Sequence, residues 1–267
     1  MQWSDALGKV HGRYAGSPRI VSLVPSLTEL LVALDLAEVL VGRTGFCIHP
    51  RQVVRRIPKL GGTKGFNVDK LRALKPTHVI VNIDENRREE VEALADFVPH
   101  LIVTHPLTVG DNLDLYRLLG GVFARERQAE SLCNAFKREW TALNVLADGL
   151  PRQHVLYLIW REPWLSVGRD TYISRMLAAA GWDTLPHESP VRYPEVDLSA
   201  LAGAADIVFL STEPYPFRKQ HLHRLQEQLP GTRCALIDGE MVSWYGSRAI
   251  HGLKYLRELR TRLANPS

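Results

Sequence analysis

The chain has 267 residues, of which 45% are hydrophobic and 23% are charged, and its formal net charge is +4. This composition is typical of a folded globular protein and excludes a disordered chain, a collagen-like fibre and a coiled coil. The 33 Lys and Arg residues are dispersed among 29 Asp and Glu residues. We therefore expect solvated helix faces and no nucleic-acid-binding surface.

Cysteine usage and the first residues bear on the cellular compartment. The three cysteines, Cys47, Cys133 and Cys234, are far apart and odd in number, which predicts neither a disulfide framework nor a CxxC zinc site. The N-terminus lacks the charged-then-apolar pattern of a secretory signal, and no run approaches 18 apolar residues. As written, the sequence predicts a cytoplasmic protein without membrane insertion, or a periplasmic one if a signal lies upstream.

Short β-branched runs alternate with helical stretches along both halves of the chain. This rhythm predicts parallel strands joined by crossover helices, and continuous apolar runs suit strands that are covered on both faces. The expected strands cover residues 19–24, 39–42, 78–82 and 100–104 in the first half, and 155–159, 207–211 and 234–238 in the second. The sequence therefore predicts an α/β fold in each half.

A long helical period separates these two halves. Apolar residues recur at helical spacing from about residue 111 to residue 146, interrupted only by Gly120 and Gly121. Residues 148–151 contain turn formers that should end this helix. We expect an N-terminal lobe over residues 1–110, a connecting backbone helix over 111–147, and a C-terminal lobe over 148–267.

Several segments occur in an order that resembles a known family. They are Asp5–Gly8, Pro18–Glu29, Val41–Arg43, the Gly61–Gly62 turn, Leu71–Ile80 and Gly181–Pro186. Together they resemble the class III periplasmic binding proteins, and the cobalamin-binding branch is the most similar. The resemblance implies two Rossmann-like α/β lobes joined by a single long backbone α-helix, with the ligand cleft between the lobes.

The resemblance also implies a ligand class and a partner. Members bind cobalamin, haem, ferric siderophores or metal ions, and they dock onto an ABC permease through one exposed glutamate on each lobe. In this chain basic residues crowd the corresponding acids in segments 86–91 and 216–220. An ABC permease is therefore a doubtful partner, whereas a small-molecule ligand such as a corrinoid or another metal chelate is expected.

Loops that follow parallel strands are where α/β folds bind ligands. Aromatic rings suit a flat macrocycle and arginines suit an anionic ligand, although core packing and loop-anchoring ion pairs, such as Arg161 with Glu162, would use the same residues. The predicted ligand-binding residues are Pro25, Ser26, Arg43, Phe46, His49, Asp84, Trp160, Arg161, Trp164, Arg192, Tyr215, Trp244, Tyr245 and Arg248. Trp182 is interpreted instead as a core residue.

Metal binding and catalysis are the alternatives. Cys47, His49 and His105 are weak candidates for direct metal ligands, because their spacing matches no zinc signature. The chain has no GxSxG, GxxxxGK[ST], GxGxxG or HExxH motif. We therefore predict a solute-binding protein that is not an enzyme and needs no cofactor. The alternative is an enzyme or sensor that uses Cys47, His49 or carboxylates in the same cleft.

Overall fold

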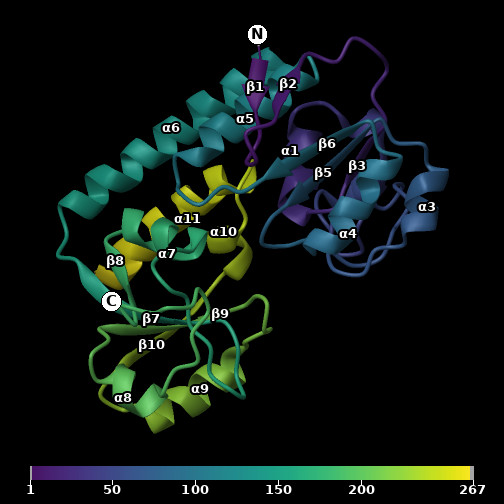
Figure 1. The fold of residues 1–267 in the computed structure, drawn as a ribbon. Coiled ribbons are helices and arrows are strands. Elements are labelled where there is room, and N and C mark those ends of the chain that lie inside the picture. The colour runs from purple at the N-terminus through teal and green to yellow at the C-terminus, as the bar shows by residue number, and fades with distance from the viewer. Residues whose placement is uncertain (1, 265–267) are drawn as a thin grey trace. The chain divides into compact units, whose positions relative to one another are not determined.

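The computed structural model describes residues 2–264 and divides into two compact units. The first unit contains the residues up to 106, with 110–135 and 245–248, and the second contains 107–109, 136–244 and the residues from 249 on. Each unit has its own four-stranded parallel sheet flanked by helices (Figure 1). The predicted α/β class and the two lobes are confirmed.

The sheet of the first unit has the strand order β4-β3-β5-β6. Its strands are β3 (Ile20–Ser22), β4 (Leu40–Arg43), β5 (His78–Asn82) and β6 (His100–Thr104). Side chains alternate between the two faces of a strand, and Val21, Val79 and Val81 share one core cluster with Leu71 and Leu94. Leu71 of α3 (Val68–Ala73), Val91 of α4 (Arg88–Glu92) and Leu94 of η2 (Ala93–Asp96) pack in this core, and Figure 1 shows α3 and α4 beside the sheet.

The remaining elements of the first unit include α1 (Pro25–Ala33), η1 (Ala37–Val39), α2 (Arg51–Val54) and α5 (Asp111–Val122), together with a hairpin of β1 (Gln2–Ser4) and β2 (Val10–Gly12). Asp5–Gly8, the first segment of the family resemblance, lies in the turn of this hairpin. Asp5 fixes it, because one carboxylate oxygen accepts from the amides of Leu7 and Lys9 while the other lies 3.0 Å from Nε2 of His11.

The sheet of the second unit has the strand order β10-β9-β7-β8. Its strands are β7 (Gln153–Leu158), β8 (Trp182–Leu185), β9 (Ile207–Ser211) and β10 (Arg233–Ile237). Figure 1 shows α8 (Leu198–Ala202) and α9 (Lys219–Gln228) on one face, and α7 (Tyr172–Ala179), α10 (Gly239–Ser243) and α11 (Arg248–Ala264) on the other. Leu156, Leu158 and Leu210 pack with Leu225 in the core beneath α9.

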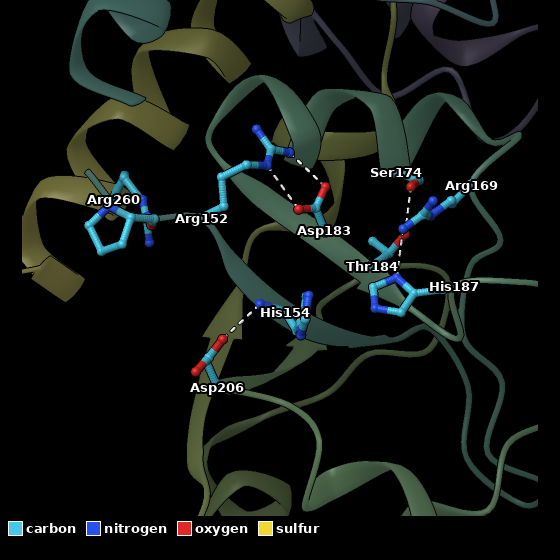
Figure 2. Close-up of polar contacts among 10 residues, drawn as sticks. Arg152, His154, Arg169, Ser174, Asp183, Thr184, His187, Asp206 and Arg260 are labelled. Carbon is cyan, nitrogen blue, oxygen red and sulfur yellow. Dashed lines mark hydrogen bonds and ion pairs between the residues drawn. The ribbon is translucent and has the colours of Figure 1, made fainter. Parts of the chain in front are cut away.

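Strand β8 was not predicted, because its four residues combine one aromatic side chain with polar ones. Trp182 is fully buried, as expected, with its ring edge-on to Phe209 at 5.0 Å between centroids. Polar pairs surround this edge strand, and Figure 2 shows the Arg152–Asp183 pair and the Ser174–Thr184 hydroxyl contact. Charged groups of this kind keep an edge strand from pairing with another chain.

The predicted single helix over residues 111–147 is two helices, α5 and α6 (Glu126–Asp148). The break is a C-terminal cap in which the amides of Ala124 and Arg125 donate to the carbonyls of Gly121 and Gly120, and Ala124 has a φ of 56°. Glycine is usual at that position, so the alanine gave no signal of a break. Gly121 instead permits a close approach, since an added Cβ would lie 2.1 Å from the Trp3 ring.

The α6 helix itself links the two units, because its residues through Ala135 belong to the first unit and those from Phe136 belong to the second. The segment 245–248 returns to the first unit, which the sequence did not indicate. The predicted domain boundaries near residues 110 and 147 stay predictions.

Candidate functional site

Each sheet presents a set of loops at the carboxyl ends of its strands, and these loops carry exposed apolar side chains. In the first unit Phe46 is 63% exposed, and Ile48 and Ile83 are also exposed. In the second unit Trp160 is 41% exposed, and Val191 and Tyr193 share this property. Single exposed apolar side chains are common on protein surfaces, and what distinguishes these is their position in loops where α/β folds bind ligands. These loops are therefore the candidate ligand-binding regions of each unit.

Arg43 and Cys47 are buried behind Phe46 at the end of β4. Arg43 is 4% exposed, and its Nε and Nη1 donate to the carbonyls of Val54 and Thr44 at 2.7 and 3.0 Å. Cys47 is fully buried, its Sγ accepts a hydrogen bond from Thr28 at 3.0 Å, and burial raises the pKa of this thiol. A neutral, inaccessible thiol is a poor nucleophile, which argues against the hypothesis of catalysis through Cys47.

The α1 helix begins at Pro25, where a missing amide hydrogen costs nothing because the first turn leaves its amides unpaired. Ser26 follows it and is 3% exposed. Tyr245, from the returning segment, is 7% exposed and donates its hydroxyl to Oε1 of Glu85 at 2.6 Å. Burial, reinforced by the Glu85 carboxylate, holds the pKa of Tyr245 well above its usual value. Tyr245 therefore stays a phenol that donates a hydrogen bond.

Arg248 forms a two-pronged ion pair with Glu29 of α1. Its Nε lies 2.8 Å from Oε2 and its Nη2 lies 2.9 Å from Oε1 of the carboxylate. Arg248 is 9% exposed, so the pair lies largely out of water. Such a fork is the strongest geometry for an arginine–carboxylate pair, and it fixes segment 245–248 on the first unit. Contact of Arg248 with a ligand stays a prediction.

Asp84 and His105 lie together at the ends of β5 and β6, with 3.3 Å between Oδ2 and Nε2. The Asp84 amide donates to the side chain of Asn82 at 2.8 Å, which fixes the turn after β5. His49 is half-buried in the loop after β4. Within residues 2–264 no group of three His, Cys, Asp or Glu side chains is arranged to hold a metal ion.

The second unit carries an aromatic cluster in its loops. The Trp160 ring stands edge-on to Tyr215 at 5.5 Å, Tyr215 lies 4.5 Å from Phe217, and Trp164 stacks on Phe217 at 6.0 Å. Trp164 and Tyr215 pack against the core below α9, as the core-packing alternative predicts. Trp160 lies at the exposed end of the cluster. Edge-to-face rings of this kind support one another, so Trp160 is held as a rigid, solvent-facing platform.

The arginines of the second unit differ in their neighbours. Arg161 lies 2.7 Å from the exposed Glu162, the ion pair that the alternative interpretation names. The Arg192 guanidinium carbon lies 6.0 Å from the centre of the Tyr193 ring, within reach of a cation–π contact. Trp244 is 7% exposed and donates its Nε1 to Oε2 of Glu213 at 3.0 Å.

Some contacts of these loops were not predicted from the sequence, although Glu85 and Glu213 were among the carboxylates considered for the catalytic alternative. Glu29, Glu85 and Glu213 are the partners that hold Arg248, Tyr245 and Trp244, and their pairing spans long sequence separations that no local pattern reveals. Ile48, Ile83, Val191 and Tyr193 were passed over because isolated apolar residues in loops look like core residues. Ile83 directly follows the predicted strand that ends at residue 82, which was a signal available, whereas Val191 and Tyr193 follow β8, which was not predicted.

Comparison with known proteins places the chain in a family. The model of a family described as "Periplasmic binding protein" matches residues 20–231. The vitamin B12-binding protein of Pectobacterium carotovorum is 24% identical over 196 residues, which cover 73% of this chain and 71% of the relative. That of Photorhabdus laumondii is 23% identical over 208 residues, which cover 73% and 75%.

Solved structures agree on the fold. The periplasmic haem-binding protein RhuT from Roseiflexus sp. RS-1 superposes with a TM-score of 0.80 at 23% identity, over 94% of this chain and all of the other. The vitamin B12-binding protein BtuF of Vibrio cholerae gives 0.79 at 16% identity, over 93% and 98%. No helix in the described part of the chain is long and apolar enough to cross a membrane. Since the family model covers most of its length, this chain belongs to the periplasmic binding protein family.

Proposed function

We propose that this protein is a solute-binding protein that holds a metal chelate of the corrinoid or haem type and has no enzymatic activity. The observation that carries the proposal is the solvent-facing Trp160 ring, supported from behind by Tyr215, in a loop where α/β folds bind ligands. A flat macrocycle needs such a surface to stack on. Family membership and curated relatives named as vitamin B12-binding proteins support the same ligand class.

The predicted ligand-binding residues take different parts in this proposal. Phe46 and Trp160 offer exposed rings, and Arg161 and Arg192 offer positive charge near Trp160 and Tyr193. Among the remaining candidates, Arg43, Trp244, Tyr245 and Arg248 are held in internal contacts and would shape the loops that carry the rings.

Titration of the full chain with aquocobalamin, haemin and a ferric siderophore, followed by tryptophan emission, tests the proposal. We expect saturable quenching by at least one of them, weakened in Trp160→Ala and unchanged in Val145→Ala. Val145 is a suitable control because it is an apolar residue, 69% exposed, on α6 and outside the loops. Absence of quenching by all three compounds would overturn the metal-chelate assignment.

The membrane partner and the compartment belong to the same proposal. The relatives that name a compartment are periplasmic, which favours the periplasm over the cytoplasm expected from the first residues. In α4, Arg88 pairs with Glu92 at 2.7 Å and Arg87 with Glu90 at 3.8 Å, so its acids are partly neutralised. We therefore expect weak stimulation of an ABC permease ATPase in proteoliposomes, strengthened by the variant Arg87→Gln/Arg88→Gln.

A further inference from the structure

A second feature of the first unit lies beside the loop after β4. It is a cavity of about 480 Å³ between the end of β4 and helix α2, here named the β4–α2 pocket. Its lining includes the cationic residues Arg43, Arg51, Arg55 and Lys59 together with His49. No aspartate or glutamate is among its lining residues. Four cationic side chains therefore line one space that no acidic side chain lines.

The buried member of this set is the most informative one. Arg43 is 4% exposed, and within the described chain its recorded hydrogen bonds go only to two backbone carbonyls, through Nε and Nη1. Its Nη2 has no hydrogen-bond partner there. A buried guanidinium without a carboxylate is costly, because desolvation of the charge is not repaid by an ion pair. Burial indeed lowers the pKa of Arg43.

Within residues 2–264 the ionisable group close to Arg43 that could supply a negative charge is the thiol of Cys47. Burial raises the pKa of that thiol above its ordinary value, so it is neutral near pH 7 and leaves the guanidinium uncompensated. The two carbonyl contacts of Arg43 use Nε and Nη1 and hold the guanidinium in a fixed orientation, which leaves Nη2 as a donor for an oxyanion.

Another pocket of the protein shows the usual arrangement, in which acidic side chains accompany the arginines. The cavity of about 350 Å³ beside β8 is also lined by two arginines, Arg169 and Arg175, but Asp170 and Asp183 line it too. Figure 2 shows Arg152 binding Asp183 with two contacts of 2.8 and 2.6 Å, and Arg169 lies 2.7 Å from Nδ1 of His187. Cations there are balanced within the protein, and the β4–α2 pocket lacks this balance.

From this contrast we propose that the β4–α2 pocket binds a multiply charged oxyanion of the phosphate type, with the buried Arg43 as its fixed anchor and Arg51, Arg55 and Lys59 as surrounding cations. A divalent anion fits better than a monocarboxylate, because four cations line the space. The anion is either free phosphate or a phosphate group carried by a larger ligand. The proposal does not rest on the proposed function.

Calorimetric titration of the full chain with inorganic phosphate, in a chloride buffer, tests the pocket. The informative variant is Arg51→Gln/Arg55→Gln/Lys59→Gln, because these exposed residues make no ion pair with any residue from 2 to 264 and their loss should leave the fold intact. We expect phosphate affinity to fall about 10- to 100-fold, since each exposed charge pair contributes up to about fivefold. Raising the chloride concentration should also weaken binding.

The matched control is Arg88→Gln/Arg117→Gln/Lys254→Gln, which removes three cations that each have an acidic partner elsewhere. It should keep the affinity of the wild type. Three results would each overturn the proposal: no phosphate binding by the wild type, equal affinity in the pocket variant, or an equal loss in the control. Arg43→Gln should abolish binding, with thermal denaturation reporting whether that variant still folds.

A competition arm separates the two sources of the anion. Cobalamin carries a phosphodiester and cobinamide lacks it. If a ligand phosphate occupies the pocket, saturating phosphate should weaken cobalamin binding and leave cobinamide binding unchanged. If the pocket takes free phosphate, added phosphate should change neither the cobalamin affinity nor the cobinamide affinity.

Discussion

The two units share one architecture, but different kinds of interaction stabilise the loops within each unit. In the first unit the strand-end loops are fixed by buried polar groups, among them the Arg248–Glu29 ion pair and the Tyr245–Glu85 hydrogen bond. In the second unit the corresponding loops are built around stacked rings that include Trp164, Tyr215 and Phe217. A parallel sheet with flanking helices therefore determines where the loops begin. It does not determine which interactions stabilise those loops.

This difference has a consequence for variants. A buried polar pair leaves an unpaired charge when one partner is removed, so damage in the first unit should appear as lost stability. An exposed ring at the end of an aromatic cluster contributes little to folding, so damage at Trp160 should appear as lost ligand affinity. Measuring the free energy of unfolding and the ligand affinity separately for each variant tests this difference between the units.

The largest expected effect is that of Arg248→Ala. It leaves the Glu29 carboxylate without its partner in a site where the two side chains are 11% and 19% exposed. We expect a loss of about 2 to 3 kcal/mol in the free energy of unfolding, somewhat less than for a fully buried pair. Urea denaturation measures this free energy. The control is Lys254→Ala, which removes an exposed i,i+4 ion pair with Glu258 and should change the free energy of unfolding little. A stable Arg248→Ala protein with reduced affinity would instead make Arg248 a ligand contact.

Acid should affect the first unit before the second. His78 stacks on His100 at 4.7 Å, and burial, followed by repulsion from His100 and His11, lowers the pKa of His78 to about 3. The unfolded chain binds that proton with a pKa of about 6.5. The stabilisation is thus complete above pH 6.5 and is lost progressively as the pH falls toward 3.

Between pH 7 and pH 5 this histidine should cost about 2 kcal/mol of stability, because each pKa unit corresponds to about 1.4 kcal/mol. Hydrogen exchange resolved by peptide should show β5 and β6 losing protection before β7 and β9. His78→Phe should keep the ring contacts and flatten the pH dependence. An equal acid sensitivity in that variant would assign the effect to other groups.

The sequence indicated more of the fold than of the site. Seven strands were predicted within about two residues, because buried parallel strands read as β-branched runs. Strand β8 was missed because an edge strand of four residues is too short to show a β-branched run. The helix break was missed because the residue with positive φ is Ala124, where a glycine would have indicated the break. The carboxyl-end rule located the loops, yet it could not separate the anchored Arg43 from the exposed Phe46. That distinction depends on tertiary contacts such as the bond to the Val54 carbonyl.

The next effect in size is on ligand binding. Trp160→Ala removes an exposed ring from the aromatic cluster, and we expect about 1 to 1.5 kcal/mol of lost affinity, close to tenfold, for a stacked macrocycle. Its unfolding free energy should stay within about 0.5 kcal/mol of the wild type. Trp160→Phe should recover part of the affinity. Equal losses of affinity and stability in Trp160→Ala would remove the proposed contrast between the units.

The smallest effect is expected at Asp84, in the loop after β5 of the first unit. The carboxylate lies 3.3 Å from His105, with the two side chains 31% and 23% exposed, and pairs of this exposure contribute at most about 1 kcal/mol. Asp84→Asn should therefore lower stability by less than that, and Asp170→Asn, whose carboxylate lies 3.5 Å from Arg175 in the second unit, is the matched control. The amide keeps the shape of the side chain and removes its charge, so a separate fall in ligand affinity in Asp84→Asn would show that the charge acts on the ligand. If affinity is unchanged in both variants, Asp84 only orders the turn after β5, and binding in the first unit depends on its exposed apolar side chains.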